Sequence, residues 1–300
     1  MKYLLVVLLA VSLSGCDKND VSYKESDYLE GKGTFTYQGY VPLSSKPVNV
    51  YYFVPDNSDS STPVLLVLHG ANRNAVDYRD AWMSYAQNNK TIIIAPEFSD
   101  AYYPGGDAYN LGNIFTDGDN PSPSTLNPEQ EWTFAIIEPL FSYIKTVTPT
   151  NVATYNMYGH SAGAQVLQKF VLLDSAVHLN KALAASAGWY TDAVTTIDFP
   201  YGLAQSPLAD IDSSNYFSKK LMIMVGENDT DPNSAGLRHN NTVDLQGLNR
   251  YDRAIHFYNL SEQTAADSNS TFNWELETVP NASHEFTESI DKAAEWLMSE

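Results

Sequence analysis

A serine between two glycines is the first feature of this 300-residue chain that could do chemistry. Gly159-His160-Ser161-Ala162-Gly163 follows an apolar run that ends at Tyr158, and a second apolar stretch comes after it. A hydroxyl that attacks an acyl carbon must be lifted above a sheet on a sharp strand-to-helix turn, and small residues two positions away let the backbone bend. This context predicts that Ser161 is a nucleophile, the alternative being a simple helix cap.

A carboxylate and an imidazole follow two later apolar runs, where parallel strands would end. The run 221–225 leads to Asp229, and the run 274–279 leads to His284. The chain order serine, acid, histidine is typical of one class of catalytic triad, in which the histidine takes the serine proton and the acid holds the imidazole. We predict Asp229 as the acid, with Asp231 as the alternative.

Two turns could supply backbone amides that stabilise an oxyanion. Ala162 follows the serine at the start of a helix, and Ala71 lies in the turn His69-Gly70-Ala71-Asn72 after the run 64–68. Asn72 is the alternative donor in that turn. We interpret His69 and His160 as parts of these backbone motifs. Acyl transfer of this kind requires no metal and no organic cofactor.

Eight strand-like runs and the stretches between them must position these groups. Early runs alternate, as antiparallel strands do, and later ones are short and continuously apolar, as buried parallel strands are. The predicted strands are 34–41, 48–54, 64–68, 91–95, 154–158, 182–187, 221–225 and 274–279. Helices are predicted over 161–174 and over 129–146, the latter with a kink at Pro139. The pattern predicts an α/β fold, with a mostly parallel eight-stranded sheet and helices on both faces, in one domain over 31–300.

The amino terminus is interpreted as a targeting signal. Lys2 is followed by an apolar run too short to span a membrane, and Leu13-Ser14-Gly15 precedes Cys16, the one cysteine. This ending resembles the bacterial lipobox, whose cysteine is lipidated and becomes the first mature residue. We predict a lipoprotein signal peptide over 1–15, lipid attachment at Cys16 and a tether over 16–30. The expected location is the bacterial cell envelope, with the domain held to a membrane by lipid in the periplasm or outside the cell.

The charge balance argues against several classes of partner. Asp and Glu number 36 against 17 Lys and Arg, so the formal net charge is −19. Nucleic acids and anionic lipid surfaces bind clustered cations, so neither is expected as an electrostatic partner. One cysteine forms neither an intrachain disulfide nor a multi-cysteine zinc site. Asp117, Asp119 and Asn120 lack a recognised calcium-loop pattern, and we interpret them as a solvated turn without a metal.

The chain resembles the α/β-hydrolase superfamily over essentially all of 31–300. Within it, the chain is similar to secreted esterases and polyester depolymerases, the group around polyhydroxybutyrate depolymerases and feruloyl or acetyl xylan esterases. The stretches that support this are 69–74, 78–82, 95–98, 188–190 and 226–232. The resemblance implies an α/β-hydrolase fold. It also implies that Trp189 and Tyr190, after the sixth strand, are substrate-binding aromatics beside the acyl pocket.

Three functions fit these observations. The favoured one is a serine esterase that cleaves small or oligomeric carboxylic esters through an acyl-enzyme intermediate. A serine peptidase or amidase would use the same triad. A non-catalytic envelope binding protein on a hydrolase scaffold is the third, and the intact set of Ser161, Asp229 and His284 weighs against it.

Overall fold

The computed structural model describes residues 28–173 and 176–299. The predicted signal peptide, Cys16 and most of the predicted tether lie outside these residues. The last residues of that tether are described, and they are docked on the domain: the Leu29 amide donates to the Val147 carbonyl at 2.8 Å, and its side chain packs against the core. Leu29, within the predicted tether, is therefore packed against the domain.

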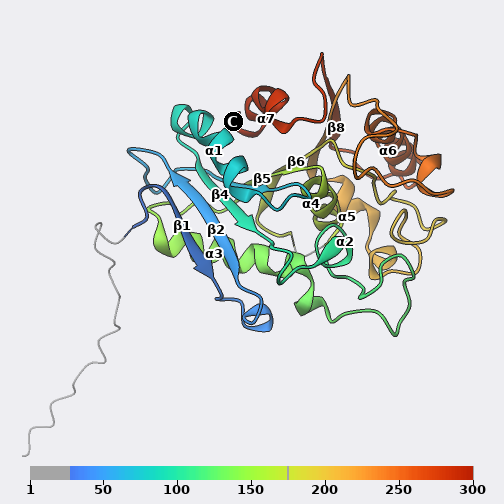
Figure 1. The fold of residues 1–300 in the computed structure, drawn as a ribbon, viewed down its shortest axis with the longest axis horizontal. Helices are drawn as coiled ribbons and strands as arrows, with labels where there is room; N and C mark the ends of the chain where they lie inside the picture. Colours follow the sequence, from blue (N-terminus) through green and yellow to red (C-terminus); the bar gives the residue numbers. More distant parts are fainter. Residues whose placement is uncertain (1–27, 174–175, 300) are drawn as a thin grey trace, which may run out of the picture.

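Eight strands form one sheet, which confirms the predicted α/β fold (Figure 1). The spatial order is β1-β2-β4-β3-β5-β6-β7-β8. β1 pairs antiparallel with β2, β2 pairs antiparallel with β4, and the remaining neighbours are parallel. The strands are β1 (Gly31–Tyr37), β2 (Val48–Val54), β3 (Val64–Leu68), β4 (Ile92–Glu97), β5 (Tyr155–His160), β6 (Leu179–Ala185), β7 (Lys220–Gly226) and β8 (Trp274–Val279).

Helices cover both faces of the sheet. The α-helices are α1 (Ala75–Asn88), α2 (Gly105–Ala108), α3 (Ile137–Val147), α4 (Ala162–Leu172), α5 (Ser213–Phe217), α6 (Arg250–Asp267) and α7 (Ile290–Leu297). Short 3-10 segments are Val41–Leu43, Glu129–Glu131, Thr133–Ile136, Pro207–Asp210, Val243–Leu245 and Phe286–Glu288. Apolar residues of α1 and α7 form one buried cluster with the sheet, and those of α3, α4 and α6 belong to the other. Within the described ranges, no helix combines the length and apolar content that a membrane span needs.

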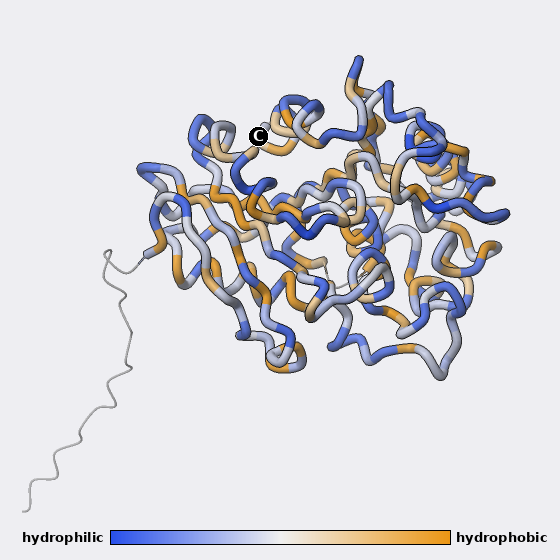
Figure 2. The backbone as a smooth tube through the Cα atoms, in the orientation of Figure 1, coloured by the Kyte–Doolittle hydropathy of each residue, from blue (hydrophilic) through white to orange (hydrophobic). Residues whose placement is uncertain are grey.

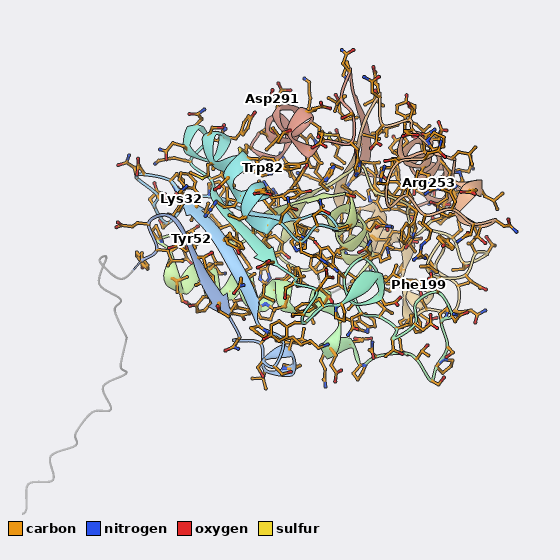
Figure 3. The ribbon with its side chains drawn as sticks, in the orientation of Figure 1. Lys32, Tyr52, Trp82, Phe199, Arg253 and Asp291 are labelled. Carbon is orange, nitrogen blue, oxygen red and sulfur yellow. The ribbon has the colours of Figure 1, made fainter. Side chains whose placement is uncertain are left out.

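The two-sided burial explains why the central strands are continuously apolar. Successive β3 side chains point to opposite faces: Leu66 packs with α3 and α4, whereas Leu65 and Val67 pack with α1 and α7. On α1, Trp82 (labelled in Figure 3) is fully buried. Its ring meets the Tyr158 ring edge-on, with centroids 5.1 Å apart. Figure 2 shows the resulting distribution: many hydrophobic residues lie along the central strands, and many hydrophilic residues lie in the outer loops.

Three local predictions are wrong in position. The first strand ends at Tyr37 rather than at residue 41, and β6 ends at Ala185 because Ser186 adopts φ +49°. The predicted helix over 129–146 becomes two 3-10 segments followed by α3. Pro139 is the third residue of α3, in the first turn, where a missing N–H costs no intrahelical hydrogen bond, so the proline does not kink the helix.

Candidate active site

The turn between β5 and α4 holds Ser161 in an unusual backbone conformation. Its φ is +54° and its ψ is −114°, a region that side-chain-bearing residues rarely adopt. The Ser161 amide donates to the Ala185 carbonyl at 2.9 Å, which fixes the turn against β6. The serine hydroxyl makes no cap hydrogen bond to α4, so the helix-cap alternative does not explain the residue.

Both glycines of the motif are required by close backbone contacts. A Cβ at Gly159 would lie 2.4 Å from the Gly163 carbonyl oxygen, and a Cβ at Gly163 would lie 2.4 Å from the Leu68 carbonyl oxygen. Real Cβ atoms do not approach oxygens that closely, and the obstructing atoms are main chain, which cannot swing away. The two glycines therefore let α4 start directly against β5 and β3.

The three predicted triad residues meet above the carboxyl ends of β5, β7 and β8. His284 Nε2 lies 3.2 Å from Ser161 Oγ, and His284 Nδ1 lies 2.8 Å from Asp229 Oδ2. The Asp229 side chain is 3% exposed and that of His284 is 30% exposed. The acid is therefore shielded from water, whereas the base and the half-buried serine can be reached from solution.

Asp229, and not Asp231, faces the imidazole. Its amide donates to the Gly226 carbonyl at 3.0 Å, which closes a tight turn after β7. The exposed Asp231 instead accepts a hydrogen bond from the Asn233 amide at 2.8 Å, so it caps the next turn. A feature that the sequence analysis missed is Arg250, the first residue of α6. Its Nη1 lies 3.5 Å from Asp229 Oδ1, and both side chains are buried.

The turn after β3 is held rigidly beside the serine. His69 Nδ1 donates to the Gly70 carbonyl at 2.8 Å, and its Nε2 accepts from the Phe98 amide at 3.0 Å. Burial is the main reason that the pKa of His69 is lowered to about 4, so the ring is neutral and serves this turn structurally. Ala71 is exposed at the top of the turn. Ala162 is the first residue of α4, where an amide has no intrahelical acceptor.

The aromatic pair predicted to bind substrate divides into two environments. Tyr190 is fully buried and stacks on Phe257 of α6, with ring centroids 4.4 Å apart, so it is a core residue and not a surface that a substrate can reach. Trp189 is also buried, at 5% exposed, and the Arg238 guanidinium covers its ring at 4.4 Å. Arg238 also pairs with Asp119, one of the residues predicted to form a solvated turn.

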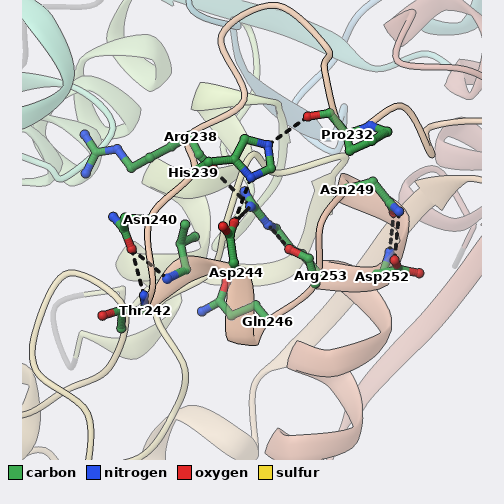
Figure 4. Close-up of polar contacts among 12 residues, drawn as sticks. Pro232, Arg238, His239, Asn240, Thr242, Asp244, Gln246, Asn249, Asp252 and Arg253 are labelled. Atoms are coloured by element: carbon green, nitrogen blue, oxygen red, sulfur yellow. Dashed lines mark hydrogen bonds and ion pairs between the residues drawn. The ribbon is translucent and has the colours of Figure 1, made fainter.

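The long segment that carries Asp229 is tied down by one arginine. Arg253 of α6 is fully buried and donates to the carbonyls of Gly188, Arg238 and Gly247, at 2.7, 2.9 and 2.8 Å. Its Nη2 also lies 3.1 Å from Asp244 Oδ1, and Asp244 in turn bonds His239 (Figure 4). One side chain thereby joins the loop after β7, the loop after β6 and helix α6.

Solved structures provide the comparison that identifies the family. The chain is 36% identical to poly(aspartic acid) hydrolase-1 from Sphingomonas sp. KT-1, over 90% of this chain and 99% of that one, with a TM-score of 0.83. The solved structures that are similar to this chain are α/β-hydrolases. This chain belongs to the α/β-hydrolase superfamily. The α/β-hydrolase described here is also 27% identical to poly(3-hydroxybutyrate) depolymerase from Bordetella parapertussis, over 89% of this chain and 88% of that one, with a TM-score of 0.79.

A third solved structure shares only the fold with this chain. S-formylglutathione hydrolase from Staphylococcus aureus is 16% identical, with 90% of this chain and 99% of that one covered and a TM-score of 0.55. No protein-family model and no curated protein matches the chain. These structures support a hydrolase on this fold and confirm the predicted superfamily.

Proposed function

We propose that this α/β-hydrolase is a serine esterase that cleaves carboxylic esters through an acyl-enzyme intermediate. The observation that carries the proposal is the continuous contact from Asp229 Oδ2 to His284 Nδ1 at 2.8 Å and from His284 Nε2 to Ser161 Oγ at 3.2 Å. A serine hydroxyl is a weak nucleophile unless a base of this kind is in reach. Similarity to the 27% identical poly(3-hydroxybutyrate) depolymerase, whose substrate is a polyester, supports the ester as the substrate class.

The geometry suggests how each residue acts. As Ser161 Oγ attacks the acyl carbon, its proton passes to His284 Nε2, and the charge of Asp229 stabilises the imidazolium. The tetrahedral oxyanion accepts hydrogen bonds from the amides of Ala162 and Ala71. When the bond between carbon and the leaving oxygen breaks, His284 returns the proton to the departing alcohol. Water then attacks the acyl-enzyme by the same proton transfers and releases the acid.

Amide hydrolysis is the second candidate, and one observation favours it. The 36% identical structure is a poly(aspartic acid) hydrolase, and the units of that polymer are joined by amide bonds. The polyester depolymerase is 27% identical. The same triad serves both reactions, because His284 can protonate a leaving amine as it does an alcohol. Paired substrates with one acyl group, as ethyl ester and as amide, separate the two: a higher kcat/KM for the amide would replace the ester proposal.

A fluorophosphonate probe tests whether Ser161 is activated. The full chain, purified in detergent, should gain one adduct by intact mass, and Ser161→Ala should abolish it. Ser186→Ala is a matched control, because Ser186 directly follows the neighbouring strand β6 and also has a positive φ of +49°. That variant should label normally. A folded wild-type protein that does not label and hydrolyses no ester would favour the binding-protein alternative.

We further propose that the protein is a lipoprotein of the bacterial envelope, anchored through Cys16. The sequence Leu13-Ser14-Gly15-Cys16 after a short apolar run supports this. In a bacterial host, radiolabelled palmitate should enter the wild-type chain, which should sediment with membranes. Cys16→Ser should incorporate no label and should leave the membrane fraction. Unlabelled, unsedimented wild-type protein would contradict the anchor.

A further inference from the structure

A tyrosine and a histidine outside the triad lie side by side beneath it. Tyr78 Oη of helix α1 is 2.8 Å from Nδ1 of His160, the residue before the serine. Both side chains are buried. Phe286, just after His284, stacks on the Tyr78 ring with centroids 4.1 Å apart and closes this pair from the side of the His284 loop. Neither residue takes part in the proton transfers described above.

His160 is also in contact with the triad imidazole. The rings of His160 and His284 are 4.8 Å apart between centroids. Burial is the main cause that lowers the pKa of His160 well below its usual range, and the neighbouring His284 adds to the effect, so His160 stays neutral. Its Nε2 is buried and meets no partner at hydrogen-bond geometry.

The protonation of the pair follows from these surroundings. Burial raises the pKa of Tyr78 above its usual range, so the phenol keeps its proton. A protonated phenol can donate to Nδ1 of a neutral imidazole, which leaves the His160 proton on Nε2. In this arrangement the Tyr78 hydroxyl donates to His160 Nδ1, and this hydrogen bond fixes the tautomer of the histidine.

The same tyrosine hydroxyl touches the turn that carries the predicted oxyanion donor. A Cβ built on Gly70 would lie 3.0 Å from Tyr78 Oη, 3.7 Å from Ser161 Cβ and 3.9 Å from His160 Nδ1. Gly70 is the residue before Ala71, so the hydroxyl lies where the oxyanion turn, the serine turn and His160 converge.

We propose that Tyr78 and His160 are positioning residues that hold the oxyanion turn and the His284 loop in register with Ser161. This inference rests on the proposed function, because it assigns a role within that triad. Tyr78 holds His160 through Nδ1 and packs against Gly70 with its hydroxyl, and the His160 ring packs against the His284 ring. Because the His160 ring is neutral, it does not repel the positive charge that forms on His284 during the reaction.

Two substitutions test whether Tyr78 positions the oxyanion turn and the His284 loop, and neither removes a catalytic residue. Tyr78→Phe keeps the ring that stacks on Phe286 and removes only the hydroxyl. We expect kcat for p-nitrophenyl acetate to fall about 10- to 100-fold with KM little changed, because a misplaced oxyanion donor acts in the transition state. Tyr155→Phe is the matched control, since it removes another buried hydroxyl, bonded to Glu138 at the far end of β5. That variant should keep wild-type kcat.

His160 offers a rescue experiment. Asn at position 160 places an acceptor near the position of Nδ1, whereas Leu places none. His160→Asn should therefore retain about 10-fold more activity than His160→Leu, if both are folded by circular dichroism at the assay temperature. A merely structural role would lower the melting temperature of both variants and leave kcat alike below it.

Nitrogen-15 NMR of the imidazoles gives a readout that needs no turnover. In Tyr78→Phe, the ring signals of both His160 and His284 should shift, whereas Tyr155→Phe should leave them in place. Unchanged His284 signals together with unchanged kcat in Tyr78→Phe would overturn the positioning role. If the wild-type chain neither labels with a fluorophosphonate nor cleaves an ester, the proposed function fails, and the imidazole signals alone still decide whether Tyr78 sets His284.

Discussion

Removal of Arg250 should damage both the stability and the catalysis of this hydrolase, because it leaves a buried carboxylate without its counter-charge. Arg250 Nη1 is 3.5 Å from Asp229 Oδ1, and the two side chains are 4% and 3% exposed. At an effective dielectric constant of about 20, two unit charges at this distance attract by about 5 kcal/mol. Loss of one partner of a buried ion pair typically costs about 3–5 kcal/mol. Arg250→Met should lower the free energy of unfolding by a similar amount.

The catalytic effect follows from the position of Asp229. Only about 1.4 kcal/mol of that interaction has to act in the transition state for kcat to fall about tenfold. The assay is ester hydrolysis at a temperature well below the melting transition of the variant, with urea unfolding measured in parallel. Arg79→Met is the matched control: its guanidinium is also buried, but it bonds the carbonyls of Gly33 and Tyr52 in β1 and β2. That variant should lose stability and keep kcat.

A double-variant cycle isolates the pair. If Arg250 acts through Asp229, then Arg250→Met should reduce kcat much less in an Asp229→Asn background than in the wild type. Full additivity would refute the reasoning, as would a folded Arg250→Met enzyme with wild-type kcat.

Three further outcomes are expected. Asp229→Asn should reduce kcat by about 10⁴-fold while Asp231→Asn stays within about twofold, as measured by initial rates; equal losses would contradict the assignment of the acid. Gly163→Ala should destabilise the fold by more than about 2 kcal/mol in urea unfolding, since its methyl group meets the Leu68 carbonyl, and an unchanged midpoint would contradict the close contact. Burial lowers the pKa of Lys169 to about 7, so between about pH 7 and 10 the unfolded chain binds a proton that the folded chain has released, and folding gains stability as the pH rises. Lys169→Met should therefore stabilise the protein by roughly 2–4 kcal/mol at pH 7 and progressively less toward pH 10 in thermal unfolding; a pH-independent difference would show that Lys169 is not the group involved.

The residues at strand ends could be predicted because their signal is local. Each of Ser161, Asp229 and His284 comes within a few residues of a short apolar run, and in a parallel sheet such runs end at one edge. The sequence therefore sufficed for the fold and for which side chains meet. It could not decide Asp229 over Asp231 by pattern, because that choice depends on the tight turn closed by the Gly226 carbonyl.

The supporting residues could not be predicted, because their partners are distant in sequence. Tyr78 and His160 are 82 positions apart and meet only because α1 packs on β5. Arg250 is the first residue of α6, and the sequence alone does not show that α6 lies beside the loop after β7. The predicted role of Tyr190 in substrate binding does not fit the structure, because adjacent side chains leave the chain in different directions and the sequence does not show which one turns inward. Trp189 lies under Arg238, and Tyr190 turns into the core.

The three carbonyl groups that bond Arg253 help to fix the conformation of the loop that carries Asp229. Residues 227–249 hold no helix beyond one short 3-10 segment, and a chain of that length would ordinarily explore many conformations. With its middle and its end fastened to one buried guanidinium, the segment loses that freedom during folding, so the arrival of substrate does not have to restrict it again. Such a loop behaves as scaffold. Trypsin should accordingly spare the Arg238 peptide in the native protein, whose carbonyl is already engaged, and cut there once Arg253 is replaced by methionine.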